Sequence, residues 1–161
     1  ILKVERSIDV KKLRVLGISF ALASCFLLAG CGNEKVLTCS INQKQSGLSM
    51  DQIAEITFND DKVTNVKLTV DSKATSDTIK DNWDTFTKSL DSQFPDSNKT
   101  GIKLTKENKE KDYTYKITID VDVTKAKDED LAEYDLDGLA DAEGTYDSVK
   151  EQAEQSGFTC K

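Results

Sequence analysis

The chain has 161 residues, with 22 Lys and Arg against 29 Asp and Glu, no histidine, and a formal net charge of −7. This acidic balance argues against a nucleic-acid partner, because phosphates attract a positively charged surface. Without histidine the chain lacks the usual base of serine hydrolases and the commonest zinc ligand, and it has no G-x-S-x-G, P-loop or G-x-G-x-x-G motif.

The N-terminal segment has the pattern of a secretory signal. Lys11, Lys12 and Arg14 precede an uncharged stretch, Val15–Ala29. A helix of that length spans roughly 22 Å, which is short of the ~30 Å hydrocarbon core of a bilayer. We therefore expect residues 1–30 to be a signal peptide and not a spanning helix, with residues 1–9 a mis-called start ahead of Val10.

The signal ends in Leu28-Ala29-Gly30-Cys31, which resembles the lipobox of bacterial lipoproteins. In those proteins the cysteine thiol is alkylated with diacylglycerol, and cleavage makes that cysteine the new N-terminus. The resemblance implies lipidation of Cys31 with fatty acids such as palmitate, which anchors the protein to the extracytoplasmic face of the cell membrane. Two or more acyl chains are enough to hold a protein there stably. The alternative is an ordinary secretory signal with an incidental cysteine.

Two of the four cysteines have no role in this scheme. Cys25 would leave with the signal and Cys31 would carry the lipid, so that Cys39 and Cys160 remain. In an oxidising compartment an even pair predicts a disulfide, here between the first strand and the last few residues. Two free thiols are the alternative.

After the lipidated cysteine and a short tether (31–35), the pattern of residues 36–161 predicts one domain. Residues 36–41 read as a strand, and residues 50–70 as a hairpin that turns at Asn59-Asp60-Asp61-Lys62. A helix capped by Ser76 and stopped by Pro95 follows. Its apolar stripe consists of Ile79, Trp83, Phe86, Leu90 and Phe94.

The second half of the domain is also predicted to be strands followed by a helix. Ile102 and Leu104 begin a strand, residues 108–111 turn, and residues 113–123 show the strongest alternation in the chain. The polar side of that alternation should face water; it consists of Thr114, Lys116, Thr118, Asp120 and Asp122. A last helix is expected from Thr145 to Gly157. The predicted fold is α+β, a single antiparallel sheet in the order β-β-β-α-β-β-α with two helices on one face and no internal repeat.

Two stretches also resemble a family. VDVTKAKDEDLAEY (121–134) and QSGFTC (155–160) are similar to segments of the YehR-like bacterial lipoproteins. These are small anchored proteins with a compact α+β domain and no established activity. The resemblance implies the anchor and the fold, and it supplies no catalytic residues.

One acidic stretch, EYDLDGLADAEG (133–144), has the spacing of a calcium loop. Carboxylates fall at its first, third, fifth and ninth positions, with Gly138 at the sixth. These candidate ligands are Glu133, Asp135, Asp137 and Asp141. The twelfth position is Gly144 where a bidentate Glu is usual, so a solvated acidic loop without a metal is the stronger interpretation.

Aromatic residues offer further candidates for binding. Trp83 lies on the predicted apolar stripe, and Tyr113 and Tyr115 share a face with Ile117. We expect all three to pack in the core. Alternatively, an exposed Trp83 could stack on carbohydrate, and the tyrosine hydroxyls could reach a ligand at the sheet edge.

Three functions fit these observations. The first is a non-enzymatic, lipid-anchored binding or interaction module of the cell envelope, which binds an unknown envelope protein or a small-molecule ligand. The second is an envelope structural protein, and the third is a carboxylate-dependent cell-wall hydrolase with two acids of differing pKa. The first is favoured, because the sequence shows no nucleophile or cofactor motif. We expect a monomer.

Overall fold

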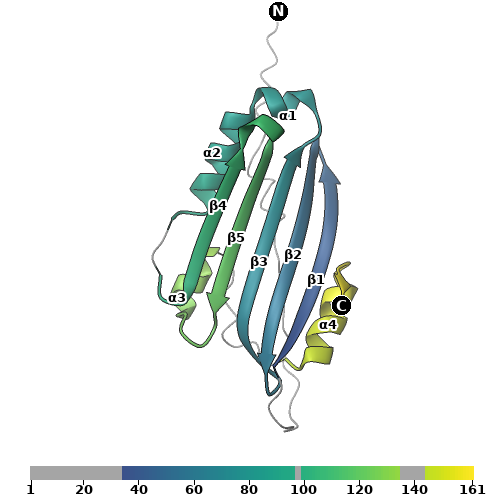
Figure 1. The fold of residues 1–161 in the computed structure, drawn as a ribbon, viewed down its shortest axis with the longest axis vertical. Helices are drawn as coiled ribbons and strands as arrows, with labels where there is room; N and C mark the ends of the chain where they lie inside the picture. Colours follow the sequence, from purple (N-terminus) through teal and green to yellow (C-terminus); the bar gives the residue numbers. More distant parts are fainter. Residues whose placement is uncertain (1–33, 97–98, 135–143) are drawn as a thin grey trace, which may run out of the picture.

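The structure is a computed structural model that describes residues 34–96, 99–134 and 144–161. Figure 1 shows a tall, twisted sheet with helices behind it and beside it. In chain order the elements are β1 (Lys35–Gln45), β2 (Leu48–Asn59), β3 (Lys62–Ala74), α1 (Asp77–Asp81), α2 (Trp83–Gln93), β4 (Ile102–Lys109), the 3₁₀ helix η2 (Glu110–Asp112), β5 (Thr114–Asp122), α3 (Asp128–Leu131), the 3₁₀ helix η3 (Ala132–Tyr134), α4 (Tyr146–Gln155) and β6 (Thr159–Cys160).

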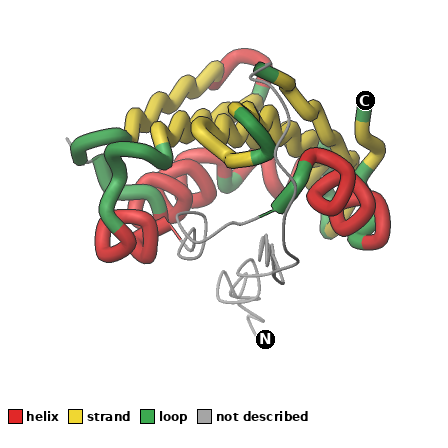
Figure 2. The backbone as a smooth tube through the Cα atoms, turned by 90° about the horizontal axis from the view of Figure 1, so that it is seen from below, coloured by secondary structure: helices red, strands yellow, loops and turns green. Residues whose placement is uncertain are grey.

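The strands form one sheet in the order β4-β5-β3-β2-β1-β6, and all the pairings are antiparallel. Figure 2 shows α2 and α4 on the same side of the sheet, α2 toward its β4 edge and α4 toward its β1 edge. The predicted α+β fold with one antiparallel sheet is therefore confirmed. The short elements α3 and β6 were not predicted.

The face under the helices holds the core. Side chains alternate along each strand, so one set points to the helices and the other to solvent. On β5 the inward set Tyr115, Ile117, Ile119 and Val121 is at most 5% exposed. Helix α4 adds Val149 and Ala153 to this core, each 1% exposed.

Two tight turns set the register of the first three strands. Asp60 and Asp61 both have positive φ, of 51° and 61°, as a type I′ hairpin turn requires. At the β1–β2 turn Gly47 has φ +82°, and its carbonyl accepts hydrogen bonds from the N–H groups of Thr75 and Ser76. A Cβ on Gly47 would lie 2.1 Å from Ser76 Oγ, so this contact admits only glycine.

The predicted first helix is two helices, broken at Asn82. Its backbone, at φ −114° and ψ 21°, leaves the helical region, and its side-chain amide donates to the carbonyl of Thr78 at 2.8 Å. Asparagine offers the backbone such a local partner in place of the helical ladder. Because the apolar stripe runs across this break, its spacing predicted one continuous helix. The predicted cap is confirmed, since Ser76 Oγ accepts from the N–H of Ile79.

The C-terminal strand closes the sheet beside β1. Cys39 pairs in register with Cys160, and Thr38 and Lys161 next to them exchange two backbone hydrogen bonds of 3.0 and 2.9 Å. The sulfurs of Cys39 and Cys160 lie 2.05 Å apart, at bonding distance. The predicted disulfide is confirmed.

Candidate functional site

The face of the sheet away from the helices is open, and its middle row carries hydroxyl groups. Paired positions on successive strands run straight across the sheet at this level. We call this set the central row; from β4 to β6 it consists of Thr105, Thr118, Thr69, Ile53, Ser40 and Thr159. None of these side chains is charged, and Ile53 is 38% exposed. Ile53 is thus the one apolar side chain in a row that otherwise consists of hydroxyl groups.

Charged side chains lie two residues to either side of the central row. On β3 they are Lys67 and Asp71, on β4 Lys103 and Glu107, and on β5 Lys116 and Asp120. Each of these strands therefore carries the pattern Lys-x-Thr-x-acid, as KLTVD, KLTKE and KITID. On all three the two charges beside the central threonine have opposite signs.

Neighbouring strands supply polar partners for two of these charges. Lys67 Nζ lies 2.8 Å from Glu55 on β2, and that hydrogen-bonded carboxylate raises the pKa of Lys67 above its ordinary value. Asp120 accepts a 2.8 Å hydrogen bond from the amide of Asn65. Such exposed cross-strand pairs each contribute only a few tenths of a kcal/mol to about 1 kcal/mol. The open face is thus charged and hydrated without a large excess of either sign.

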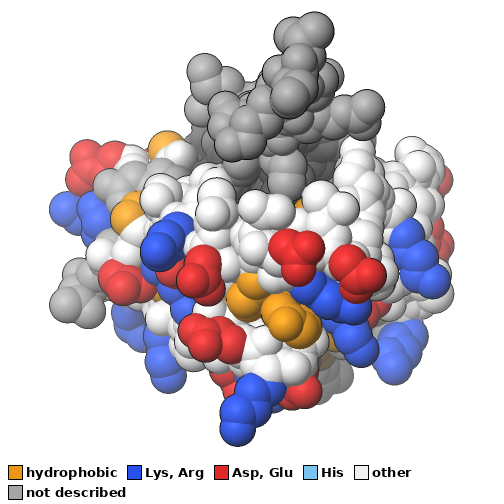
Figure 3. Space-filling model, turned by 90° about the horizontal axis from the view of Figure 1, so that it is seen from above, with side chains coloured by type: hydrophobic (Ala, Val, Ile, Leu, Met, Phe, Trp, Pro, Cys, Tyr) orange, Lys and Arg blue, Asp and Glu red, His pale blue; other side chains and the backbone are white. Residues whose placement is uncertain are grey.

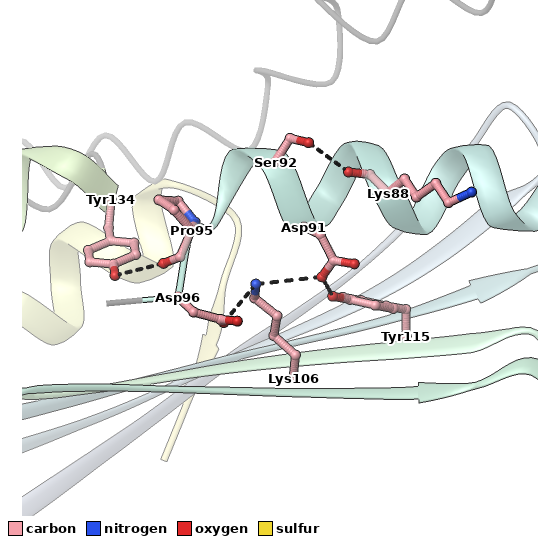
Figure 4. Close-up of polar contacts among 8 residues, drawn as sticks. All are labelled: Lys88, Asp91, Ser92, Pro95, Asp96, Lys106, Tyr115 and Tyr134. Carbon is pink, nitrogen blue, oxygen red and sulfur yellow. Dashed lines mark hydrogen bonds and ion pairs between the residues drawn. The ribbon is translucent and has the colours of Figure 1, made fainter. Parts of the chain in front are cut away.

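A second polar group lies on the covered face, under the end of α2 (Figure 4). Lys106 of β4 contacts Asp96 at 2.9 Å and Asp91 at 3.5 Å, one carboxylate on either side of the helix end. The hydroxyl of Tyr115 on β5 donates to the same Asp91. We call Asp91, Asp96, Lys106 and Tyr115 the α2 clamp. Close by, the hydroxyl of Tyr134 donates to the carbonyl of Pro95 at 3.3 Å.

The α2 clamp is suited to holding a helix and not to attacking a substrate. Tyr115 is 2% exposed, and burial, followed by its hydrogen bond to Asp91, raises the pKa of its hydroxyl well above the ordinary value. A tyrosine that keeps its proton is a hydrogen-bond donor and a poor nucleophile. A cation at the C-terminal end of a helix is also stabilised by the negative end of the helix dipole. Lys106 and Tyr115 therefore fix α2 to β4 and β5.

The aromatic residues named from the sequence take core positions. Trp83 is 3% exposed, and its indole N–H donates to Asn108 at 3.1 Å. Its ring lies against Phe86 and Tyr113, with centroids 5.3 and 6.0 Å away. The predicted packing of Trp83 and Tyr115 is confirmed, while Tyr113 is half-buried at the strand end. A carbohydrate-stacking role for Trp83 needs an exposed ring, so it is excluded.

The remaining predicted site residues lie largely outside the described part of the chain. These are Cys31 and three of the calcium candidates, Asp135, Asp137 and Asp141, together with the side chain of Glu133. Among residues 34–96, 99–134 and 144–161 no cluster of three potential metal ligands occurs. Within the same ranges no helix is long and apolar enough to cross a bilayer.

The sequence interpretation missed both the central row and the α2 clamp. A short repeat, Lys-x-Thr-x-acid on three strands, was the available signal for the central row, although the chain has no long internal repeat. For the α2 clamp there was no such signal, because its members come from a helix, a loop and two strands that only the fold brings together.

Comparisons with known proteins concern the fold alone. No family model matches the chain, and no curated protein matches it. An NMR structure of a protein from Streptococcus pneumoniae TIGR4 is similar, with a TM-score of 0.52 and 15% sequence identity. The match covers 86% of this chain and 92% of that one. At this identity the similarity supports the α+β fold and carries nothing about activity.

Proposed function

We propose that this chain is a lipid-anchored binding or interaction protein, without enzymatic activity, on the extracytoplasmic face of a bacterial membrane. The observation that carries the proposal is the bonded pair Cys39–Cys160. Such bonds persist in oxidising compartments outside the cytoplasm. The Leu-Ala-Gly-Cys motif ending at Cys31 supplies the anchor, and the resemblance to the YehR-like lipoproteins is part of the same proposal.

The start of the sheet supports an anchor close to the domain. Strand β1 begins at Lys35, four residues after Cys31, so an extended tether reaches about 14 Å. The sheet end that holds Lys35 would lie nearest the membrane, and the end that holds α1 farther from it. Figure 3 views the α1 end, where charged side chains of both signs surround a small hydrophobic group. A mixed surface of this kind suits a protein or small-molecule partner better than a nucleic acid.

The anchor is tested by expressing the full chain in a bacterium and measuring the intact mass of the mature protein. We expect cleavage before Cys31, an added diacylglycerol mass, and partition into the detergent phase. Cys31→Ala should abolish the lipid mass and the partition. Cys25→Ala is the matched control, because it changes a cysteine of the same segment and should leave lipidation intact.

The opposite result would reject the anchor. If Cys31→Ala partitions like the unchanged chain, or if mature protein carries no lipid mass, the chain is attached in another way or not at all. The compartment is tested by alkylating free thiols immediately on extraction, so that the redox state of Cys39 and Cys160 is preserved. If both are recovered as free thiols, the result would contradict an oxidising location.

A further inference from the structure

The charges of the open face have a symmetry that a second copy of this chain would satisfy. On β3, β4 and β5 the residue two positions before the central-row threonine is Lys, and the residue two positions after it is acidic. Because β5 is antiparallel to β3 and β4, Asp120 lies on the same side of the row as Lys67 and Lys103. A half-turn about the line of the central row exchanges these two positions on every strand. Two copies stacked face to face about that line would place Lys67 opposite Asp71, Lys103 opposite Glu107 and Lys116 opposite Asp120.

We propose that the open face is a self-interaction surface, on which two copies pack face to face about a two-fold axis along the central row. Each of the three pairings occurs twice, which gives six ion pairs between the copies. The half-turn also places each central-row side chain opposite its own copy, so that Ile53 meets Ile53 and Thr118 meets Thr118. This buries an isoleucine that is 38% exposed in the single chain.

The alternative two-fold axis, along the strands, does not fit the charges. It keeps each row in place and reverses the strand order, so that β3 lies over β2 of the other copy. Asp71 would then face Asp51, although Lys67 would face Glu55. The axis along the central row leaves one unfavourable pairing, Glu55 of β2 opposite Asp51 of the other copy, which also occurs twice. Lys67, which already contacts Glu55 at 2.8 Å, lies beside that pairing.

The size of the face is adequate for a weak dimer. Strands spaced about 4.8 Å apart and a rise of about 3.4 Å per residue give a face of roughly 25 by 30 Å, or about 750 Å² per copy. Stable interfaces bury about 800 Å² per partner. Since exposed ion pairs set register more than affinity, the pairing should be specific and salt-sensitive but not tight.

The proposal does not depend on the anchor. The half-turn reverses the strand direction, so the starts of β1 in the two copies lie at opposite ends of the dimer, each about 17 Å from the axis. The β1 edges of both copies lie on the same side of the dimer. With tethers of about 14 Å, both copies reach one membrane only when that edge faces it, and not when the Lys35 end of each sheet is nearest the bilayer.

Thiol cross-linking of the full-length protein tests the proposal. Thr118→Cys places a thiol on the axis, with the two sheets about 10 Å apart, within reach of a short bismaleimide. Thr114→Cys is the matched control, on the same strand and face but four residues away, so that its two copies lie roughly 27 Å apart. Mature protein should cross-link at position 118 and not at position 114. The protein without an added cysteine is treated in parallel. A cross-link in that sample would come from a Cys31 that carries no lipid, so it would show a failure of the anchor and not of this proposal.

Charge reversal then tests the register. In the Thr118→Cys background, one chain carries Lys67→Glu and Lys103→Glu, and the other carries Asp71→Lys and Glu107→Lys. Each alone opposes like charges, so the cross-linked fraction should fall roughly tenfold. Mixed together, they oppose unlike charges and cross-linking between the two chains should return, which also shows that both are folded. No cross-link at position 118, equal cross-linking at 114, or no recovery in the mixture would each overturn the proposal.

Discussion

The two long helices cover the same face of the sheet, yet they are held there by different means. Helix α2 lies between β3 and β4 in the chain, so that strands flank it on both sides, and the α2 clamp ties its end to β4 and β5. Helix α4 is followed by the two-residue strand β6. Its attachment includes apolar packing by Val149 and Ala153 and the disulfide that joins β6 to β1.

The difference follows from the strands on either side of each helix. A helix flanked by long strands loses little further entropy on docking, because its neighbours already fix both ends. Strand β6 has only two residues, so it gives α4 less support. The disulfide is found where the flanking strand is shortest, and non-covalent contacts suffice where the flanking strands are long.

Removing the disulfide should therefore have the largest effect. Cys39 and Cys160 are 121 residues apart, and closing a loop of this length contributes about 5 kcal/mol in the chain-entropy model. Cys39→Ala with Cys160→Ala should lower the free energy of unfolding by several kcal/mol, as measured by urea titration. Hydrogen exchange should quicken in α4 and β6 while α2 stays protected; equal quickening in both helices would contradict the comparison.

Loosening the α2 clamp should cost less and should depend on pH. Tyr115→Phe removes a hydrogen bond to a carboxylate, worth about 1.5 kcal/mol near neutral pH. In the unfolded chain this tyrosine ionises near pH 10, whereas the folded protein holds its proton to higher pH. Above pH 10 the folded state thus binds more protons, and its stability falls by about 1.4 kcal/mol per pH unit on this account.

The comparison of denaturation curves at pH 8 and pH 11 isolates this effect. The unchanged protein should lose more stability than Tyr115→Phe over that interval. The difference in the free energy of unfolding between the two should therefore be smaller at pH 11 than at pH 8. If this difference in the free energy of unfolding does not change with pH, the hydroxyl of Tyr115 titrates alike in the folded and unfolded chains. Lys106→Met is a second variant, which keeps the aliphatic length and removes the charge between Asp91 and Asp96.

The smallest expected effect concerns the start of α4. Thr145 Oγ1 accepts a hydrogen bond of 3.3 Å from the N–H of Ser148, whereas α2 has no side-chain cap at its start. Thr145→Ala should lower the melting temperature by an amount equivalent to about 1 kcal/mol. Thr145→Ser keeps the acceptor and should restore most of the loss. A loss as large as that from the disulfide would mean that the cap, and not the bond, holds α4.

The sequence predicted the elements that depend on local periodicity. The alternation of 113–123 and the turn at 59–62 correspond to β5 and the β2–β3 hairpin, because period and turn chemistry act over a few residues. The break at Asn82 was missed, since the apolar spacing continues through it and only the amide contact to Thr78 ends the helix. Strand β6 was missed as well, because two residues carry no periodic signal and pairing with Cys39 defines it.

The site was less predictable than the fold. That Thr69, Thr105 and Thr118 lie in one row depends on the registers of β3, β4 and β5, which involve pairings between residues more than ten positions apart. Periodicity gave the face on which each threonine lies, but not its neighbours. The α2 clamp likewise joins Asp91 to Lys106 and Tyr115 across two connections.

The position of the disulfide has a mechanical consequence. Tension applied between the N-terminal side of β1 and the C-terminus passes along residues 34–39, through the sulfur–sulfur bond, and out at Lys161. Those few residues extend to no more than roughly 30 Å. Without the bond, residues 34–161 would extend to about 450 Å. A force applied at Lys161 of a chain held before β1 would thus pass to that attachment through the disulfide, while the rest of the sheet carries little of it.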